Sequence, residues 1–69
     1  MSIRIQRWRR TRRECRLMTD RTTTDARHGA RLLRDAAGAL HASRRGGYVA
    51  VYRDGVRDYQ PCVLNDRLV

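Results

Sequence analysis

The sequence predicts a single small α+β domain over residues 1–69, in which one central helix packs on a small antiparallel sheet. Three observations lead to this class: an alanine-rich amphipathic stretch in mid-chain, a hairpin pattern around Asp54-Gly55, and alternating apolar and polar residues near the start. The expected order is β-α-β-β, or β-β-α-β-β if the first segment folds back on itself. The first segment is needed in the sheet because a two-stranded hairpin alone is marginal in water.

The first segment is predicted to begin a strand at residue 2 or 3. Ile3 and Ile5 alternate with polar neighbours, which is the two-residue period of a strand. Residues 15–17 would then form a second strand or continue the first. A helix is the alternative for this segment, with a stripe formed by Ile5, Trp8, Cys15 and Met18.

The middle segment predicts a helix from about residue 24 to residue 44. Residues 22–25 supply an N-cap and a Thr-x-x-Asp pattern that resembles a capping box. Gly46 and Gly47 are the expected left-handed stop, with Arg44 and Arg45 in the last turn. One apolar stripe recurs at helical spacing and consists of Ala26, Ala30, Leu33, Ala37 and Leu40. A stripe built mostly of alanine predicts close packing on a neighbour, and Gly29 beside it allows close backbone approach.

The last segment predicts a β-hairpin with strands at residues 48–53 and 56–60. Asp54-Gly55 is a strong turn signal because both residue types accept positive φ. A two-residue loop pairs Tyr52 with Arg57 and Ala50 with Tyr59, whereas a three-residue loop pairs Tyr52 with Val56 and Val49 with Tyr59. The two registers put Tyr59 on different faces. Residues 62–64 continue as a strand end or edge after Pro61.

Length and composition limit the classes of function. Leu, Ile and Val make up only 13 of the 69 residues, there is no Phe, and the formal net charge is +9. A domain of this size buries about 60% of the surface of its unfolded chain, so a closed catalytic pocket is not expected. No apolar run approaches membrane-spanning length and no signal-peptide core follows Met1. We therefore expect a cytosolic, non-enzymatic binding protein, and the thin core with an apolar edge at 62–69 suggests a homodimer.

The basic charge is concentrated at the front of the chain. All 16 basic residues are Arg, and the charge balances are +6 for residues 1–18, +3 for residues 19–47 and zero for residues 48–69. This asymmetry predicts a polyanion or an acidic protein surface as the partner.

The first set of candidate binding residues lies in this basic front. Guanidinium groups release counterions from a nucleic-acid backbone, and Trp8 is suited to stack on a base or to anchor in a protein pocket. The alternative is a strand with Trp8 in the core and its arginines in solvent. The candidates are Arg4, Arg7, Trp8, Arg9, Arg10, Arg12, Arg13 and Arg16.

Two further sets lie on the helix and in the hairpin. Arg27, Arg31 and Arg34 recur at spacings of four and three, as a basic ridge or as an ordinary solvated face. The tyrosines of the hairpin offer a contact surface, but core packing is the expected state because the core lacks other aromatics. These tyrosines are Tyr48, Tyr52 and Tyr59.

No catalytic, metal or cofactor site is expected. The only histidines, His28 and His41, are 13 residues apart on the predicted helix, so they point in different directions. Together with Cys15 and Cys62 they form no zinc-binding spacing. We expect the two cysteines to be small buried apolar residues.

The last 45 residues resemble the end of a small phage-encoded anti-CRISPR family. The resemblance lies in Tyr48-Val-Ala-Val-Tyr-Arg-Asp54-Gly55, followed by Arg57, Tyr59 and Cys62, after an alanine-rich helix. It implies a β-α-β-β topology and a protein that docks on backbone subunits of a type I CRISPR effector and obstructs target-DNA pairing. The Arg-rich front has no counterpart there. A +9 protein does not mimic DNA, so docking would use acidic protein surface or bound nucleic acid.

Two functions from different classes follow. One is an inhibitor from a phage or mobile element that docks on a nucleic-acid-handling complex, in particular a type I CRISPR effector. The other is a small regulatory or accessory protein that binds DNA or RNA directly through its Arg-rich segment.

Overall fold

The computed structural model describes all residues 1–69 and contains six strands and one helix. The order is β-β-α-β-β-β-β, so the first segment folds back on itself and the simpler β-α-β-β order is wrong. The elements are β1 (Ile3–Arg10), β2 (Cys15–Thr23), α1 (Ala26–Ser43), β3 (Gly47–Arg53), β4 (Val56–Asp58), β5 (Val63–Leu64) and β6 (Arg67–Leu68).

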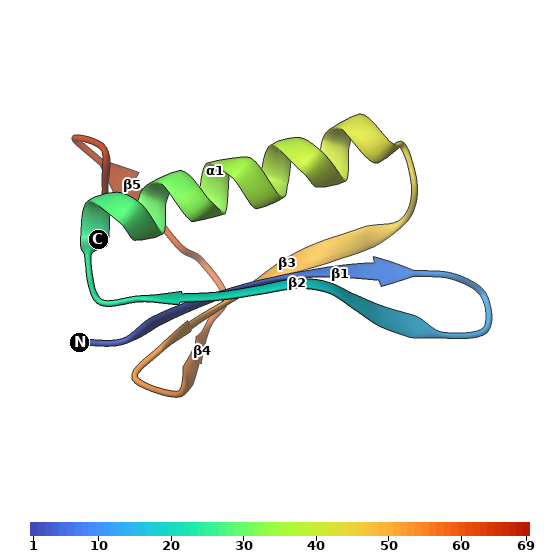
Figure 1. The fold of residues 1–69 in the computed structure, drawn as a ribbon, viewed down its shortest axis with the longest axis horizontal. Coiled ribbons are helices and arrows are strands. Elements are labelled where there is room, and N and C mark those ends of the chain that lie inside the picture. The colour runs from blue at the N-terminus through green and yellow to red at the C-terminus, as the bar shows by residue number, and fades with distance from the viewer.

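Four strands form one antiparallel sheet in the order β2-β1-β3-β4, with the first strand near its centre. Helix α1 runs along one side of this sheet, and the β1–β2 hairpin extends beyond the C-terminal end of the helix (Figure 1). The other side of the sheet is covered by no element (Figure 1). We call that side the open face.

The core lies between α1 and the sheet and is small and aliphatic. Ile3, Ile5 and Val51 are almost fully buried, and they pack with Ala36 and Leu68. Gly29 faces Ile3, since a Cβ on it would lie 3.1 Å from Ile3 Cδ1. The expected close approach at Gly29 is therefore confirmed.

The buried face of α1 differs from the predicted stripe. Ala37 is exposed, whereas Gly29 and Ala36 are buried, and Leu32 joins Leu33 against the core. The face has rotated toward the Gly29 side because glycine and alanine there let the helix approach Ile3 and Ile5 closely.

The helix begins as expected and ends differently. Asp25 is the N-cap, and its Oδ1 accepts a hydrogen bond of 2.9 Å from the Arg27 backbone N–H. At the other end the left-handed residue is Arg44, with φ 54°, and not one of the glycines. Arg44 and Arg45 therefore lie beyond the last turn, and Gly47 is the first residue of β3.

The hairpin after α1 adopts the two-residue loop. Tyr52 pairs with Arg57 and Arg53 with Val56, and both Asp54 and Gly55 have positive φ. The three-residue register is wrong. The second strand ends at Asp58, so the expected pairing of Ala50 with Tyr59 does not form.

The C-terminal residues form a separate small hairpin. Strands β5 and β6 pair with each other, and Leu68 is buried against α1. Residues 62–69 are thus not an apolar edge of the main sheet, which removes that argument for a homodimer. Cys15 and Cys62 are exposed free thiols, so the expected burial of both cysteines is wrong. No helix has the length and apolar character needed to cross a membrane.

Candidate functional site

Strand β1 divides its side chains between the two faces of the sheet. Ile3 and Ile5 lie in the core under α1, and successive side chains of a strand alternate, so Arg7 and Arg9 share their face. The other set lies on the open face and consists of Arg4, Gln6, Trp8 and Arg10. The basic front is therefore not one surface but two.

Strands β3 and β4 add aromatic and basic side chains to the open face. Tyr48 lies directly opposite Trp8, Ala50 opposite Gln6, and Tyr52 opposite Arg4. On the next strand Arg57 lies opposite Tyr52. We call the group of Trp8, Tyr48, Tyr52 and Arg57 the open-face platform.

The expectation that the tyrosines pack in the core is wrong. Tyr48 and Tyr52 are half-buried on the open face, Tyr59 is 80% exposed just beyond β4, and Trp8 is also half-buried outside the core. Val49 and Val51 of β3 face the core under α1, so the alternation of the strand places Tyr48 and Tyr52 on the other side. The aromatic residues therefore gather on the uncovered side, where they are partly or largely exposed to solvent.

The rings at the centre of the platform are held in a stacked arrangement. Trp8 and Tyr48 have ring centroids 6.1 Å apart and an interplanar angle of 12°. Trp8 Nε1 donates a hydrogen bond of 3.0 Å to Gln6 Oε1, which fixes the indole ring. Ala50 lies between Tyr48 and Tyr52 on the same face of β3 and is fully buried beneath the side chains of the platform. The Trp8–Tyr48 pair is thus held in place by contacts within the chain.

Arg57 links the tyrosines. Its guanidinium carbon lies 5.9 Å from the ring centroid of Tyr48, 5.7 Å from that of Tyr52 and 4.9 Å from that of Tyr59. Its Nε is buried and has no hydrogen-bond acceptor. Arg10 lies over the Tyr48 ring as well, at 5.6 Å. Cations and rings therefore alternate across this face.

An ion pair borders the platform on the β2 side. Arg4 donates through Nε and Nη2 to the two carboxylate oxygens of Asp20, at 2.8 and 2.5 Å. Hydrogen bonding to Arg4 holds the pKa of the Asp20 carboxyl below its ordinary value, and the same contact raises the pKa of Arg4. Next to this pair lies a hollow of about 470 Å³, lined by Ser2, Arg4, Gln6, Thr22, Tyr52 and Gly55.

This ion pair predicts a specific pH dependence of stability. The folded-state pKa of Asp20 is depressed, so its stabilising effect is complete above the ordinary value of 3.8 and is lost as the pH falls through the folded-state value. We expect Asp20→Asn to show a smaller loss of the free energy of unfolding between pH 6 and pH 3 than the wild type, measured by urea denaturation. The control is Asp35→Asn, because Asp35 forms no ion pair. An equal loss in Asp20→Asn and wild type would contradict the prediction.

The other arginines of the front lie elsewhere. Arg7 and Arg9 point to the helix side of the sheet, and Arg16 lies directly opposite Arg9 on β2. Arg12 and Arg13 occupy the exposed turn between β1 and β2. This turn is closed by Thr11, whose hydroxyl accepts hydrogen bonds from the backbone N–H groups of Arg13 and Glu14.

The arginines on the helix flank form an exposed surface apart from the platform. Arg27, Arg31 and Arg34 are all exposed, and Arg34 forms an ion pair of 2.8 Å with Asp66 in the β5–β6 turn. Both side chains of this pair are largely in solvent, so it contributes little to stability. The exposure of the flank is compatible with a basic ridge and with an ordinary solvated face.

Sequence reasoning missed two members of the open face, namely Gln6 and Arg57. The two-residue loop would have identified Arg57, because it puts that residue opposite Tyr52. His28 and His41 are both exposed, and no group of three or more His, Cys, Asp or Glu residues is placed to hold a metal ion.

Comparison of the chain with protein-family models, curated proteins and solved structures finds no match. A functional assignment therefore depends on the side chains of the chain itself.

Proposed function

We propose that this protein binds single-stranded nucleic acid on the open face of its sheet. The observation that carries the proposal is the open-face platform, in which Trp8 and Tyr48 stack in the centre of an uncovered sheet with Arg10 and Arg57 against the rings. Aromatic side chains on an exposed sheet are typical of proteins that stack unpaired bases, and interleaved arginines neutralise the phosphates.

The geometry favours a single strand over a duplex. Bases in a duplex are stacked on each other, so their ring faces are not available to Trp8 or Tyr48. Tyr48 and Tyr52 are four residues apart on β3, which separates them by ~13 Å along the strand. That separation gives room for one base at the Trp8–Tyr48 pair and another at Tyr52. Arg57 lies between the two positions.

Binding of short oligonucleotides tests the proposal. We expect a 12-nucleotide single strand to bind more tightly than a duplex of the same length in 150 mM salt, with quenching of the fluorescence of Trp8, the only tryptophan. Trp8→Ala should weaken binding by ~5- to 150-fold, because base–aromatic stacking contributes about 1–3 kcal/mol per base. Fluorescence anisotropy of a labelled strand measures the affinity.

Two variants serve as controls. Trp8→Phe keeps an aromatic face and should retain most of the affinity. Leu64→Ala removes an exposed apolar side chain from β5, away from the sheet, and should bind like the wild type. Tighter binding of the duplex, or equal affinity of Trp8→Ala and wild type, would overturn the proposal.

The second candidate function is docking on a nucleic-acid-handling complex, as the anti-CRISPR resemblance implies. The observation that favours it is the composition of the platform, since Trp, Tyr and Arg are the residues that dominate the energetics of protein interfaces. Under this function Trp8→Ala or Tyr52→Ala abolishes inhibition of a type I CRISPR effector, while affinity for free oligonucleotides is weak in wild type and variants alike.

A further inference from the structure

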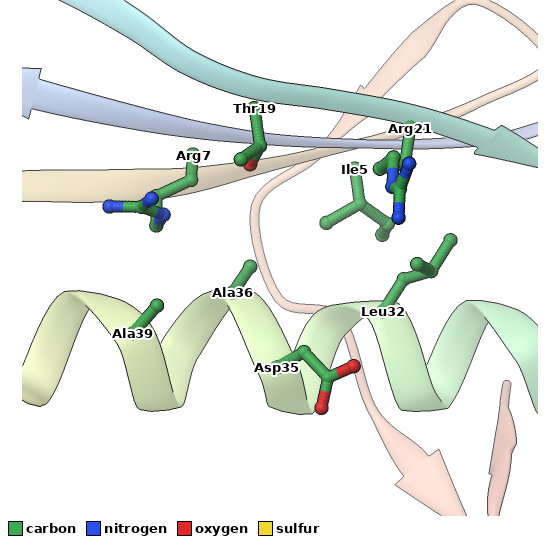
Figure 2. Close-up of a pocket in the computed structure, with 8 residues that line it drawn as sticks. All are labelled: Ile5, Arg7, Thr19, Arg21, Leu32, Asp35, Ala36 and Ala39. Carbon is green, nitrogen blue, oxygen red and sulfur yellow. The ribbon is translucent and has the colours of Figure 1, made fainter.

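A second basic surface lies on the opposite side of the sheet, between α1 and the β1–β2 hairpin. It begins at a cavity of about 220 Å³ whose floor is formed by Ile5, Leu32 and Ala36. Arg7 and Arg21 project from the two strands toward the helix at this cavity, and Asp35 is the only acidic residue that lines it (Figure 2). Neither arginine forms an ion pair.

A second hollow of about 190 Å³ continues the first toward the C-terminal end of the helix. The two hollows share Arg7, and the second is also lined by Arg9, Arg45 and Leu40. Trp8 borders this hollow too, although its ring stacks on Tyr48 on the open face. Arg16 lies opposite Arg9 on β2 and so faces the same side. We call the continuous surface the basic groove; its arginines are Arg7, Arg9, Arg16, Arg21 and Arg45.

The arginines of the basic groove have no partner within the chain. The three ion pairs of the structure use other arginines. None of the five groove side chains donates a hydrogen bond to another residue of the chain. Arg9 Nε is buried without an acceptor. Arg9 and Arg16 are a directly opposed pair of like charges, which destabilises a sheet. An anion seated between them would remove both penalties.

The spacing of these arginines indicates a ligand with several charges. Arg21 lies opposite Ile5, Arg7 is two residues further along β1, and the Arg9–Arg16 pair two residues beyond that. Successive positions are thus ~7 Å apart along the strand. A row of positive charge at regular steps, over an apolar floor, suits a chain of anions better than a single small anion.

We propose that the basic groove binds a chain of phosphates, by charge and without reading bases. The ligand chemistry is that of a phosphodiester backbone or of inorganic polyphosphate. The groove and the open-face platform lie on opposite sides of the sheet, so the groove does not depend on base stacking. A nucleic acid that reaches both sides would be held by its bases on one and by its phosphates on the other.

A phosphate chain that carries no bases tests the groove directly. The probe is a labelled abasic deoxyribose-phosphate 12-mer, with inorganic polyphosphate of about the same number of phosphates as the second ligand. The test variant is Arg7→Gln with Arg9→Gln. The control is Arg12→Gln with Arg13→Gln, which removes the same charge from the exposed turn of the same segment. Circular dichroism and thermal unfolding show whether each variant is folded.

We expect the groove variant to lose at least ~10-fold in affinity for the abasic chain and the turn variant about 2-fold. The slope of the logarithm of the binding constant against the logarithm of the salt concentration should decrease in magnitude by ~1.4 in the groove variant, since each single-strand phosphate contact contributes about 0.7 to that slope. Arg16→Gln, at an exposed edge position, is a second variant that keeps the buried groups intact and should lose ~3-fold. Equal losses in the groove and turn variants would overturn the proposal.

Competition separates this proposal from the proposed function. A trinucleotide that quenches Trp8 should still do so when the abasic chain is present at saturation, because the two ligands occupy different faces. Displacement of the trinucleotide by the abasic chain would mean that both ligands bind to the same site, and it would contradict the proposal of a separate basic groove. Absence of Trp8 quenching by any oligonucleotide would count against the platform only. Tighter binding of polyphosphate than of the abasic chain would assign the groove to that polymer.

Discussion

Replacing Gly47 by alanine is expected to lower the free energy of unfolding by about 3 kcal/mol, because the side chain has no space. A Cβ on Gly47 would overlap the backbone carbonyl oxygen of Trp8 and would lie 2.9 Å from Leu40 Cδ1. The carbonyl belongs to the central strand and cannot move aside without breaking the pairing of β1 with β3. Urea denaturation followed by circular dichroism measures the loss.

The effect of this substitution should extend to the platform. Gly47 pairs with Arg9 next to the Trp8–Tyr48 pair, so a shift of β3 here separates the two stacked rings. The control is Gly38→Ala, at a helix position where a Cβ meets no atom within 4 Å. Alanine is the better helix former by about 1 kcal/mol, so Gly38→Ala should stabilise the protein. Wild-type stability of Gly47→Ala would show that β3 and β1 leave room for a Cβ at this position, which would contradict the prediction.

The fold was predictable wherever local signals were strong. The Asp25 cap and the alanine-rich periodicity identified α1 to within two residues, and Asp54-Gly55 identified the hairpin after it. The β1–β2 hairpin was left open because its turn, residues 11–14, contains no Gly, Asn or Pro. It is held by hydrogen bonds from the backbone to the Thr11 hydroxyl, a weaker signal in a sequence.

The end of the helix was misjudged because two glycines follow it. Glycine is the usual left-handed residue after a helix, but here Arg44 takes that conformation. Gly47 is needed instead for the close approach of β3 to β1. This requirement depends on tertiary packing, so the local sequence pattern does not predict it.

The candidate site was predictable in composition but not in placement. The sequence identifies Trp8, Tyr48 and Tyr52 as candidate residues. Because the core lacks other aromatic residues, however, the tyrosines were expected on the face that packs against the helix, and they lie on the open face. The alternation of strand β1 is sufficient to place Trp8. Ile3 and Ile5 face the core, so the even-numbered residues of β1, including Trp8, lie on the other face of the sheet. By the same alternation, Arg7 and Arg9 lie on one face of the sheet and Arg10 on the other. Reading the basic front as one segment concealed its division between two faces.

The largest effect of a core substitution is expected at Ile3. This side chain is completely buried between the sheet and α1, next to Gly29, and it belongs to a core of only five buried residues. Ile3→Ala should lower the free energy of unfolding by about 3 kcal/mol, from lost burial and from the cavity left behind. In a domain of this size that corresponds to a fall of roughly 15 °C in the unfolding midpoint, measured by thermal denaturation.

A second substitution tests whether Gly29 and Ile3 share this space. In the wild type a Cβ on Gly29 would lie 3.1 Å from Ile3 Cδ1, a tight contact that offsets the gain in helix propensity. In Ile3→Ala that atom is absent, so Gly29→Ala fills part of the cavity and also favours the helix. We expect Gly29→Ala to recover about 1 kcal/mol in the Ile3→Ala background and to give no gain in the wild type. Equal effects of Gly29→Ala in both backgrounds would mean that helix propensity acts alone and that α1 does not contact the sheet at this point.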